Sequence, residues 1–281
     1  MSMTVQITPL GEYTGAEVTG IDLKLPVDHA TKKKLNQALV DYACLVIRDQ
    51  DYTPDDYMNA VHVFGEPAVQ YFDELSLSGY PMINIVSSHH KDTNGKPNMR
   101  GSSWHTDQTN HERPPKCTIL YAIELPDEGG DTGVCNMCAA YEALPGEFKE
   151  RINELKTVNV FYGRAAVGSS IMGQKLQNER KVDSYIHPLV RTHPESGKKA
   201  VYYNDNKTDT FVGMTPEDTR TLLKEISFLA IKPEFIYRHK WRQGDMLVCD
   251  NRQAMHQAFH DYDRSQHRLF HRIILEGDRP V

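Results

Sequence analysis

His105 and Asp107 are the residues of this chain whose types and spacing could do chemistry. They lie two positions apart in the stretch Trp104-His105-Thr106-Asp107, so in an extended segment both side chains project to the same side. Such a pair can occupy two adjacent corners of a metal ion. A second histidine from elsewhere in the chain would complete a set of two histidines and one carboxylate that leaves three positions open on an octahedral metal. That set is typical of non-haem Fe(II) sites.

The third ligand must come from a distant part of the chain, and His256 is the best candidate. It follows Met246 to Cys249 and then Asp250-Asn251-Arg252, which together indicate a strand that ends in a polar turn. This order predicts that His256 lies at the rim of a barrel or sandwich. His260 is the rival, and a hydrogen-bonded structural role is the alternative for either histidine.

Two arginines in the last strand-like segment, Arg268 and Arg272, alternate with apolar residues in the run HRLFHRIIL. They therefore share one face with Phe270 and Ile274. Burial of an unpaired guanidinium is costly, so carboxylates of the protein or of a ligand should pair with them. The planar fork of arginine suits a carboxylate or another oxyanion. The alternative is that both arginines are solvent-exposed on an edge strand.

The composition is that of an ordinary globular protein. The chain has 281 residues, 39% hydrophobic residues and a formal net charge of -6, which argues against nucleic acid and anionic membranes as partners. It shows no signal-like N-terminal region and no apolar run long enough to span a membrane, so we expect a cytoplasmic protein. Its five cysteines are odd in number and irregularly spaced, which predicts reduced thiols, and the C-x-x-C at Cys135 and Cys138 is interpreted as two core residues.

Periodicity and turn signals predict a single domain over residues 1–281 with a β-rich α+β fold. The core would be a sandwich or jelly-roll decorated by helices. Residues 163–184 lack any sustained period, and either a mobile flap over a site or a plain surface loop fits them. The expected elements are strands at 5–8, 16–21, 44–48, 82–86, 117–124, 158–162, 187–194, 200–203, 235–241, 246–249 and 267–275, with helices ending near Tyr42, Phe64, Leu144, Leu155 and Ala230.

Several short motifs, taken in order, resemble one enzyme family over nearly the whole chain. They are His105-Thr106-Asp107, Pro114-Pro115, Glu124-Leu125-Pro126 with Gly129-Gly130-Asp131-Thr132, Ala139 to Leu144, Arg191-Thr192-His193-Pro194 with Gly197, Gly244-Asp245, Asp250-Asn251-Arg252 and His271-Arg272. Together they are similar to the taurine and phenoxyacetate-herbicide dioxygenases, which use Fe(II) and 2-oxoglutarate.

The resemblance implies roles for individual residues. His105, Asp107 and His256 would hold the iron, and Thr132 with Arg268 would hold the distal carboxylate of 2-oxoglutarate. Arg272 would bind an acidic group of the substrate. The implied fold is the double-stranded β-helix, a jelly-roll, and relatives commonly form dimers or tetramers.

The resemblance also bears on the substrate. Taurine-type members place a histidine where this chain has Gln70, which argues against taurine. Tyr71, Asn110, Tyr202 and Asn204 are further candidates for polar contacts with the substrate.

The chemistry that the resemblance implies is the oxidation of a C–H bond by Fe(II), 2-oxoglutarate and O2, with release of succinate and CO2. The substrate would be a small organic anion, namely a carboxylate, sulfonate, sulfate ester or phosphonate, and hydroxylation is the expected outcome. Desaturation and oxidative dealkylation remain alternatives at the same iron site. A zinc-binding protein and a non-catalytic β-rich binding protein are the alternatives from other classes.

Overall fold

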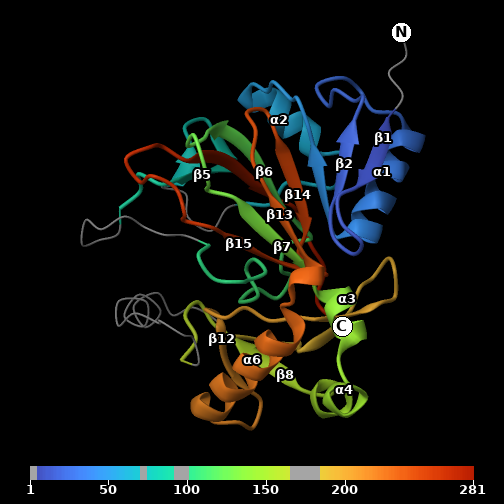
Figure 1. The fold of residues 1–281 in the computed structure, drawn as a ribbon, viewed down its shortest axis with the longest axis vertical. Coiled ribbons are helices and arrows are strands. Elements are labelled where there is room, and N and C mark those ends of the chain that lie inside the picture. The colour runs from blue at the N-terminus through green and yellow to red at the C-terminus, as the bar shows by residue number, and fades with distance from the viewer. Residues whose placement is uncertain (1–4, 70–74, 92–100, 165–183) are drawn as a thin grey trace.

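The computed structural model describes residues 5–69, 75–91, 101–164 and 184–281, and it shows a strand-rich chain with a smaller number of helices (Figure 1). The strands are β1 (Gln6–Pro9), β2 (Ala16–Thr19), β3 (Cys44–Ile47), β4 (Ser76–Leu77), β5 (Tyr80–Ser87), β6 (Cys117–Glu124), β7 (Thr132–Asn136), β8 (Lys156–Asn159), β9 (Tyr185–Pro188), β10 (Val190–Thr192), β11 (Lys199–Val201), β12 (Thr208–Phe211), β13 (Ile236–His239), β14 (Met246–Asp250), β15 (Ala254–Ala258) and β16 (Leu269–Ile274). The helices are α1 (His29–Tyr42), α2 (Pro54–Val61), α3 (Met137–Ala143), α4 (Gly146–Ile152) and α6 (Pro216–Ala230), with a short 3-10 helix η2 (Pro233–Phe235).

The three helices with strong N-terminal signals begin where those signals stand in the sequence. Asp28 accepts a hydrogen bond from the backbone of Thr31 and caps α1. Thr53 and Asp56 form a reciprocal capping box at the start of α2, and Thr215 caps α6. A proline occupies the first turn of both α2 and α6, where its missing N–H costs nothing.

Within the described ranges the largest sheet has eight strands in the order β1-β2-β3-β14-β6-β16-β5-β4. Side chains alternate across it: Met246 and Val248 of β14 pack with α1 and α2, whereas Leu247 and Cys249 face the opposite side. Both faces are covered, and for that reason β3 and β14 consist wholly of buried residues.

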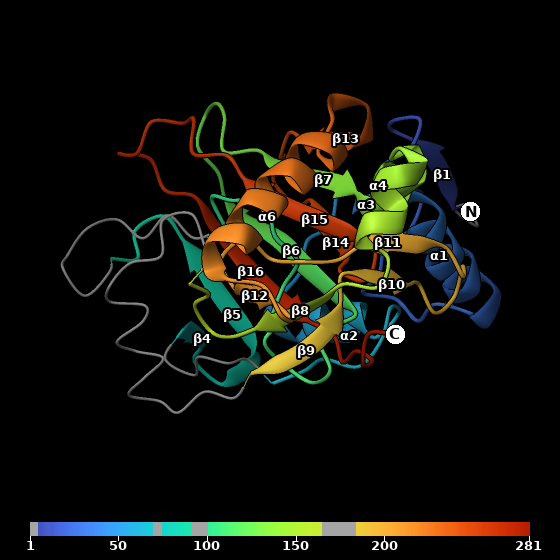
Figure 2. The ribbon, with the colours of Figure 1, turned by 90° about the horizontal axis from the view of Figure 1, so that it is seen from below.

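A three-stranded sheet, β13-β7-β15, covers the second face of the large sheet. Val134 of β7 and Ala254 of β15 pack there against Val46 and Leu247. Their neighbours Cys135 and Met255 point away from the large sheet and pack with α3, α4 and α6 in a separate core. Seen from below, α3, α4 and α6 lie on the near side of the molecule (Figure 2).

Most of the expected elements are present, and β6 has the predicted bounds. The expected strand at 158–162 is wrong in position, because β8 spans Lys156–Asn159, where it pairs with both β9 and β12. The expected flap or loop at 163–184 lies, apart from its ends, outside the described residues. No helix in the described part of the chain has the length and apolar character that a membrane crossing requires.

The five cysteines are all buried and unpaired, as predicted. Burial raises the pKa of each thiol, to about 12 for Cys135 and for Cys138. A raised pKa leaves little thiolate at neutral pH, so the C-x-x-C pair has the chemistry of core residues and not of a redox motif.

Candidate metal centre

His105 and His256 face each other across a short stretch of paired backbone. The amide of His105 donates to the carbonyl oxygen of His256 at 3.1 Å, and the amide of His256 donates back at 2.7 Å. His256 lies in the middle of β15, where it stands opposite Val134 of β7. The three-stranded sheet therefore fixes the position of His256, and His256 in turn fixes the segment that carries His105 and Asp107.

These three side chains, which we call the His-Asp-His triad, form a donor set. One potential ligand atom from each lies within 4.8 Å of the others, and no further such group is found among the described residues. Nε2 of His105 is 3.8 Å from Oδ1 of Asp107, and the two imidazole rings are 4.3 Å apart at their centroids. His260, the rival of His256, is not part of this group. Two nitrogens and one carboxylate oxygen on one side leave room for exogenous ligands on the other.

The histidines are held in the form that a metal needs. Nδ1 of His105 is 2.7 Å from the carbonyl oxygen of Ser103, an acceptor, so the proton resides on Nδ1 and Nε2 presents its lone pair. Burial, with a further contribution from His105, lowers the pKa of His256 to about 3, so that this ring is neutral at physiological pH. Nδ1 of His256 is buried and has no hydrogen-bond partner in the described part of the chain. A buried nitrogen without a described partner, next to the other two donors, fits a metal or a water at this site.

Asp107 is ionised and held by one oxygen only. Its Oδ2 accepts hydrogen bonds from Oγ1 of Thr118 at 2.6 Å and from the guanidinium of Arg272 at 3.2 Å. Burial alone would raise the pKa of Asp107, but the charge of Arg272 and the neighbouring polar groups hold it well below the ordinary value. Thr118 is in turn the acceptor for Nδ2 of Asn251 at 2.9 Å. Oδ1, the oxygen nearer to His105, is left for a metal.

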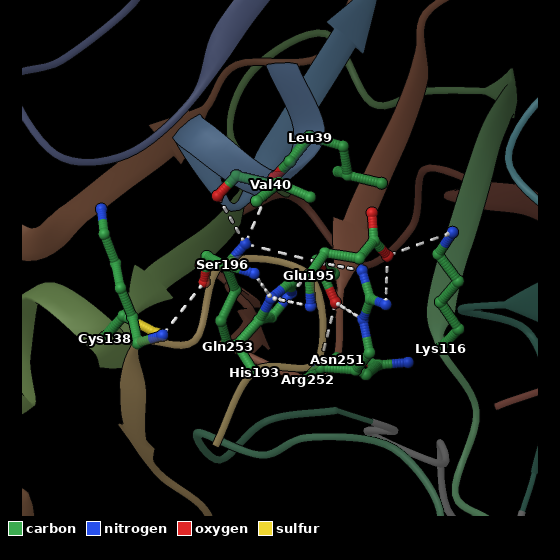
Figure 3. A network of polar contacts seen from close by, with 12 residues as sticks. Leu39, Val40, Lys116, Cys138, His193, Glu195, Ser196, Asn251, Arg252 and Gln253 are labelled. Atoms are coloured by element: carbon green, nitrogen blue, oxygen red, sulfur yellow. Dashed lines mark hydrogen bonds and ion pairs between the residues drawn. The ribbon is translucent and has the colours of Figure 1, made fainter. Parts of the chain in front are cut away.

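The turn between β14 and β15, which delivers His256, is held by a buried polar network (Figure 3). Asp250 accepts from Nε and from a terminal nitrogen of Arg252, both at 2.8 Å, and lies 3.0 Å from Nε2 of His193. Arg252 also contacts Glu195 at 2.5 Å, and Gln253 donates to the backbone of α1. Burial opposes the ionisation of Asp250, but these donors hold its pKa below the ordinary value. The motifs at 191–197 and 250–252 thus meet in one network.

Arg268 has a buried guanidinium with few partners. Its Nε donates to the carbonyl oxygen of Gly130 at 2.8 Å, and a terminal nitrogen lies 3.3 Å from Oγ1 of Thr132. Its planar group lies over the ring of Phe270 at 4.3 Å, and Nε1 of Trp241 donates to the same Thr132 oxygen. Gly130 has a φ of +68°, and a Cβ there would lie 3.2 Å from the Arg268 side chain, so any other residue at this position would be strained.

Arg268 forms no ion pair with a carboxylate of the described residues, and the charges of Tyr262 and Asp131 offset the effect of its burial only in part. Its side chain is 6% exposed, and no carboxylate of the described residues is within ion-pair distance of it. Burial lowers the pKa of Arg268 to about 10, so that the group stays cationic at neutral pH. A buried cation whose partners are one carbonyl and one hydroxyl is arranged to receive an anion.

The predicted substrate contacts are described only in part. Gln70 and Tyr71 lie outside the described residues. Asn110 and Tyr202 are both buried, and the Tyr202 ring packs against the Arg191 guanidinium at 4.8 Å. Their predicted roles stay predictions.

Two residues near the triad carry no recognisable motif in the sequence. In the sequence Thr118 is one residue of a buried strand, and in the structure it is a buried polar residue on the β6 face that carries Leu120 and Ala122. Lys207 gave no signal, because nothing in its local sequence relates it to His105.

The chain matches the model of the family described as "Taurine catabolism dioxygenase TauD, TfdA family" over residues 6–274. It is 31% identical to an alkylsulfatase of Acinetobacter baylyi, with 98% of this chain and 86% of that protein covered. It is 30% identical to an alpha-ketoglutarate-dependent sulfate ester dioxygenase of Pseudomonas putida, with 100% and 92% covered. The structure superposes with a TM-score of 0.84 and 29% identity on AAD-2 in complex with Mn(II) and N-oxalylglycine, covering 99% of both chains.

Proposed function

The chain belongs to the taurine catabolism dioxygenase TauD, TfdA family, and on that premise we propose that the His-Asp-His triad of His105, Asp107 and His256 holds the iron of its active site. The protein is an Fe(II)- and 2-oxoglutarate-dependent dioxygenase. The observation that carries the assignment is the convergence of two imidazoles and one ionised carboxylate, whose potential ligand atoms lie within 4.8 Å of one another. A buried arginine, Arg268, has no carboxylate partner among the described residues.

The chain's own residues orient the ligands. The carbonyl oxygen of Ser103 holds the His105 ring, while Thr118 and Arg272 hold the Asp107 carboxylate by its other oxygen. Bound iron supplies the oxidation itself, in which 2-oxoglutarate and O2 become succinate and CO2 and one oxygen atom enters a C–H bond of the substrate.

Arg268 and Thr132 are the proposed site for the distal carboxylate of 2-oxoglutarate. The two side chains already contact each other at 3.3 Å, and the Arg268 guanidinium has no carboxylate partner among the described residues. A carboxylate bound there would balance a buried positive charge, and the hydroxyl of Thr132 would donate to one of its oxygens.

Arg272 is the proposed contact for an acidic group of the substrate. Its side chain is 16% exposed, lies on β16 four residues after Arg268 and donates to Asp107, so its charge stands at the edge of the triad. The relatives named above act, by their names, on alkyl sulfates and sulfate ester substrates, which are small anions. We propose hydroxylation of a small organic anion as the reaction.

We also propose that the core of the fold is a double-stranded β-helix. The facing sheets, β13-β7-β15 and the central strands of the eight-stranded sheet, support a double-stranded β-helix. The chain would form a single domain around them, with the triad between the sheets.

A succinate-release screen tests the function. The protein is incubated with Fe(II), ascorbate and 2-oxoglutarate, and each candidate sulfonate, sulfate ester, phosphonate or carboxylate is added separately. At least one should raise succinate release above the substrate-free level in the wild type and not in Asp107→Ala. Equal succinate release in both proteins would contradict the assignment of the triad.

A further inference from the structure

The turn that follows β11 is hydrogen-bonded directly to the segment that carries His105 and Asp107. Asn204 stands opposite His105 in a bridge of paired backbone, and its Nδ2 donates to the carbonyl oxygen of Thr106 at 2.7 Å. The side-chain oxygen of the same Asn204 accepts from the backbone amide of Lys207 at 3.1 Å. One buried side chain therefore fixes the backbone of Lys207 relative to His105 and Asp107.

The ammonium group of Lys207 lies in this region with little to neutralise it. Nζ is over the ring of Phe161, 4.5 Å from its centroid, and 3.4 Å from the carbonyl oxygen of that residue. No ion pair of Lys207 is present in the part of the chain that the structure covers. An ammonium has three donors, and a single long contact to a carbonyl oxygen leaves it poorly satisfied.

Asp107 of the triad and the proposed substrate contact Arg272 both act on the ammonium group of Lys207. Burial lowers its pKa to about 8, Asp107 counteracts that effect, and the positive charge of Arg272 adds to it. Burial lowers the pKa of His111, and the charge of Lys207 adds to that effect. Two cations from different elements, the turn after β11 and the strand β16, therefore act on the same region.

We propose that Lys207 and Arg272 together bind the head group of the substrate, and that this head group is a tetrahedral oxyanion, a sulfonate, sulfate ester or phosphonate, in preference to a carboxylate. The inference rests on the proposed function, because it concerns the same active site. It narrows the four anion classes that Arg272 alone would admit.

The number of oxygens decides the preference. A carboxylate has two oxygens, and one arginine fork satisfies both. A sulfonate or sulfate ester has three outer oxygens, so it can offer one to a second cation without giving up the arginine. Lysine suits that second role because its ammonium is a compact point charge that needs no planar partner. One terminal nitrogen of Arg272 already donates to Asp107, so Arg272 has fewer donors left for the substrate head group and a second cation contributes more to binding it.

A matched pair of probes tests the preference. Hexane-1-sulfonate and heptanoate share the same alkyl chain and differ only in the head group, and hexyl sulfate serves as a second tetrahedral probe. Their dissociation constants are measured by calorimetry under nitrogen, with the protein loaded with Fe(II) and 2-oxoglutarate. The variants are Lys207→Met, which removes the charge at similar length, and Lys207→Arg, which restores it. Lys224→Met, an exposed lysine on α6, is the control.

The wild type should bind both tetrahedral probes more tightly than heptanoate. Lys207→Met should weaken their binding about 10- to 100-fold, the range expected for one lost charge-assisted hydrogen bond, and leave heptanoate within about threefold. Lys207→Arg should recover most of the loss, and Lys224→Met should match the wild type. A purely structural Lys207 would weaken all three probes alike.

The proposal is overturned if the wild type prefers heptanoate or binds no tetrahedral probe, or if Lys207→Met leaves that binding unchanged. These results contradict the proposed role of Lys207 if the protein still shows the charge-transfer absorption band of bound Fe(II) and 2-oxoglutarate. Absence of that band in the wild type would instead mark a failure of the proposed function.

Discussion

Replacing Thr118 by valine would isolate the hydrogen bond that holds Asp107. Valine has nearly the shape of threonine, so the change removes a hydroxyl and creates no cavity in the buried face of β6. The hydroxyl donates to Oδ2 of Asp107 at 2.6 Å and accepts from Nδ2 of Asn251 at 2.9 Å. Both contacts are lost together.

The two losses have different consequences. A hydrogen bond to a charged group contributes about 1.5–3 kcal/mol, and a buried amide that loses its acceptor costs about 1–3 kcal/mol. We expect the free energy of unfolding of the metal-free Thr118→Val protein to fall by about 2–5 kcal/mol, since these contributions overlap. The affinity for metal should fall about 10- to 100-fold, as is usual when a ligand loses its supporting contact.

Urea unfolding measures the first effect, and titration with Mn(II) or, under nitrogen, Fe(II) measures the second. Thr118→Ser keeps the hydroxyl and is the matched control, so it should retain most of the metal affinity. Metal binding as tight in Thr118→Val as in the wild type would refute the claim that Thr118 positions Asp107 as a ligand.

Three further changes probe the surroundings of the triad. Arg272→Leu should raise the KM for the anionic substrate about tenfold or more and weaken metal binding slightly, because Arg272 also donates to Asp107, while the 2-oxoglutarate dissociation constant measured by titration stays nearly constant; the reverse pattern would contradict the assigned roles. Thr106→Ala removes a hydrogen bond to the carbonyl oxygen of Asn251 and should lower the free energy of unfolding, measured in urea, by about 0.5–1.5 kcal/mol with little change in metal affinity. Loss of metal binding in this variant would contradict the claim that Thr106 is not a ligand. Asp250→Asn should lower the Tm at neutral pH, and the gap to the wild type should narrow as the pH falls below the ordinary carboxyl pKa of 3.8, because a lowered pKa stabilises the fold above that value and this gain is lost below it; a gap independent of pH down to strong acid would rule out an ionised Asp250.

The sequence was sufficient for elements whose signals are local. Caps and proline at the start of α2 and α6, and the β-branched and aromatic run of β6, predict their positions without knowledge of the fold. The short strands β7, β12 and β15 were not predicted. Their residues adopt extended structure because neighbouring strands pair with them, and such pairing is a tertiary effect that a local pattern does not contain.

The same distinction applies to the site. The spacing of His105 and Asp107 and the alternation of Arg268 and Arg272 are readable from the sequence, since each depends on one strand. The partner Thr118 is not, because it reaches Asp107 from β6 through a 2.6 Å hydrogen bond. Lys207 is not either, because its backbone is placed near the triad only through Asn204.

Anaerobic addition of Fe(II) and 2-oxoglutarate tests the central claim most directly. Chelation of Fe(II) by the keto acid gives a weak visible charge-transfer band that zinc does not give. The wild type should develop this band with one equivalent of iron, whereas His256→Ala and Asp107→Ala should not. A wild type without the band, or a full band in both variants, would contradict the assignment of His105, Asp107 and His256 as the iron site.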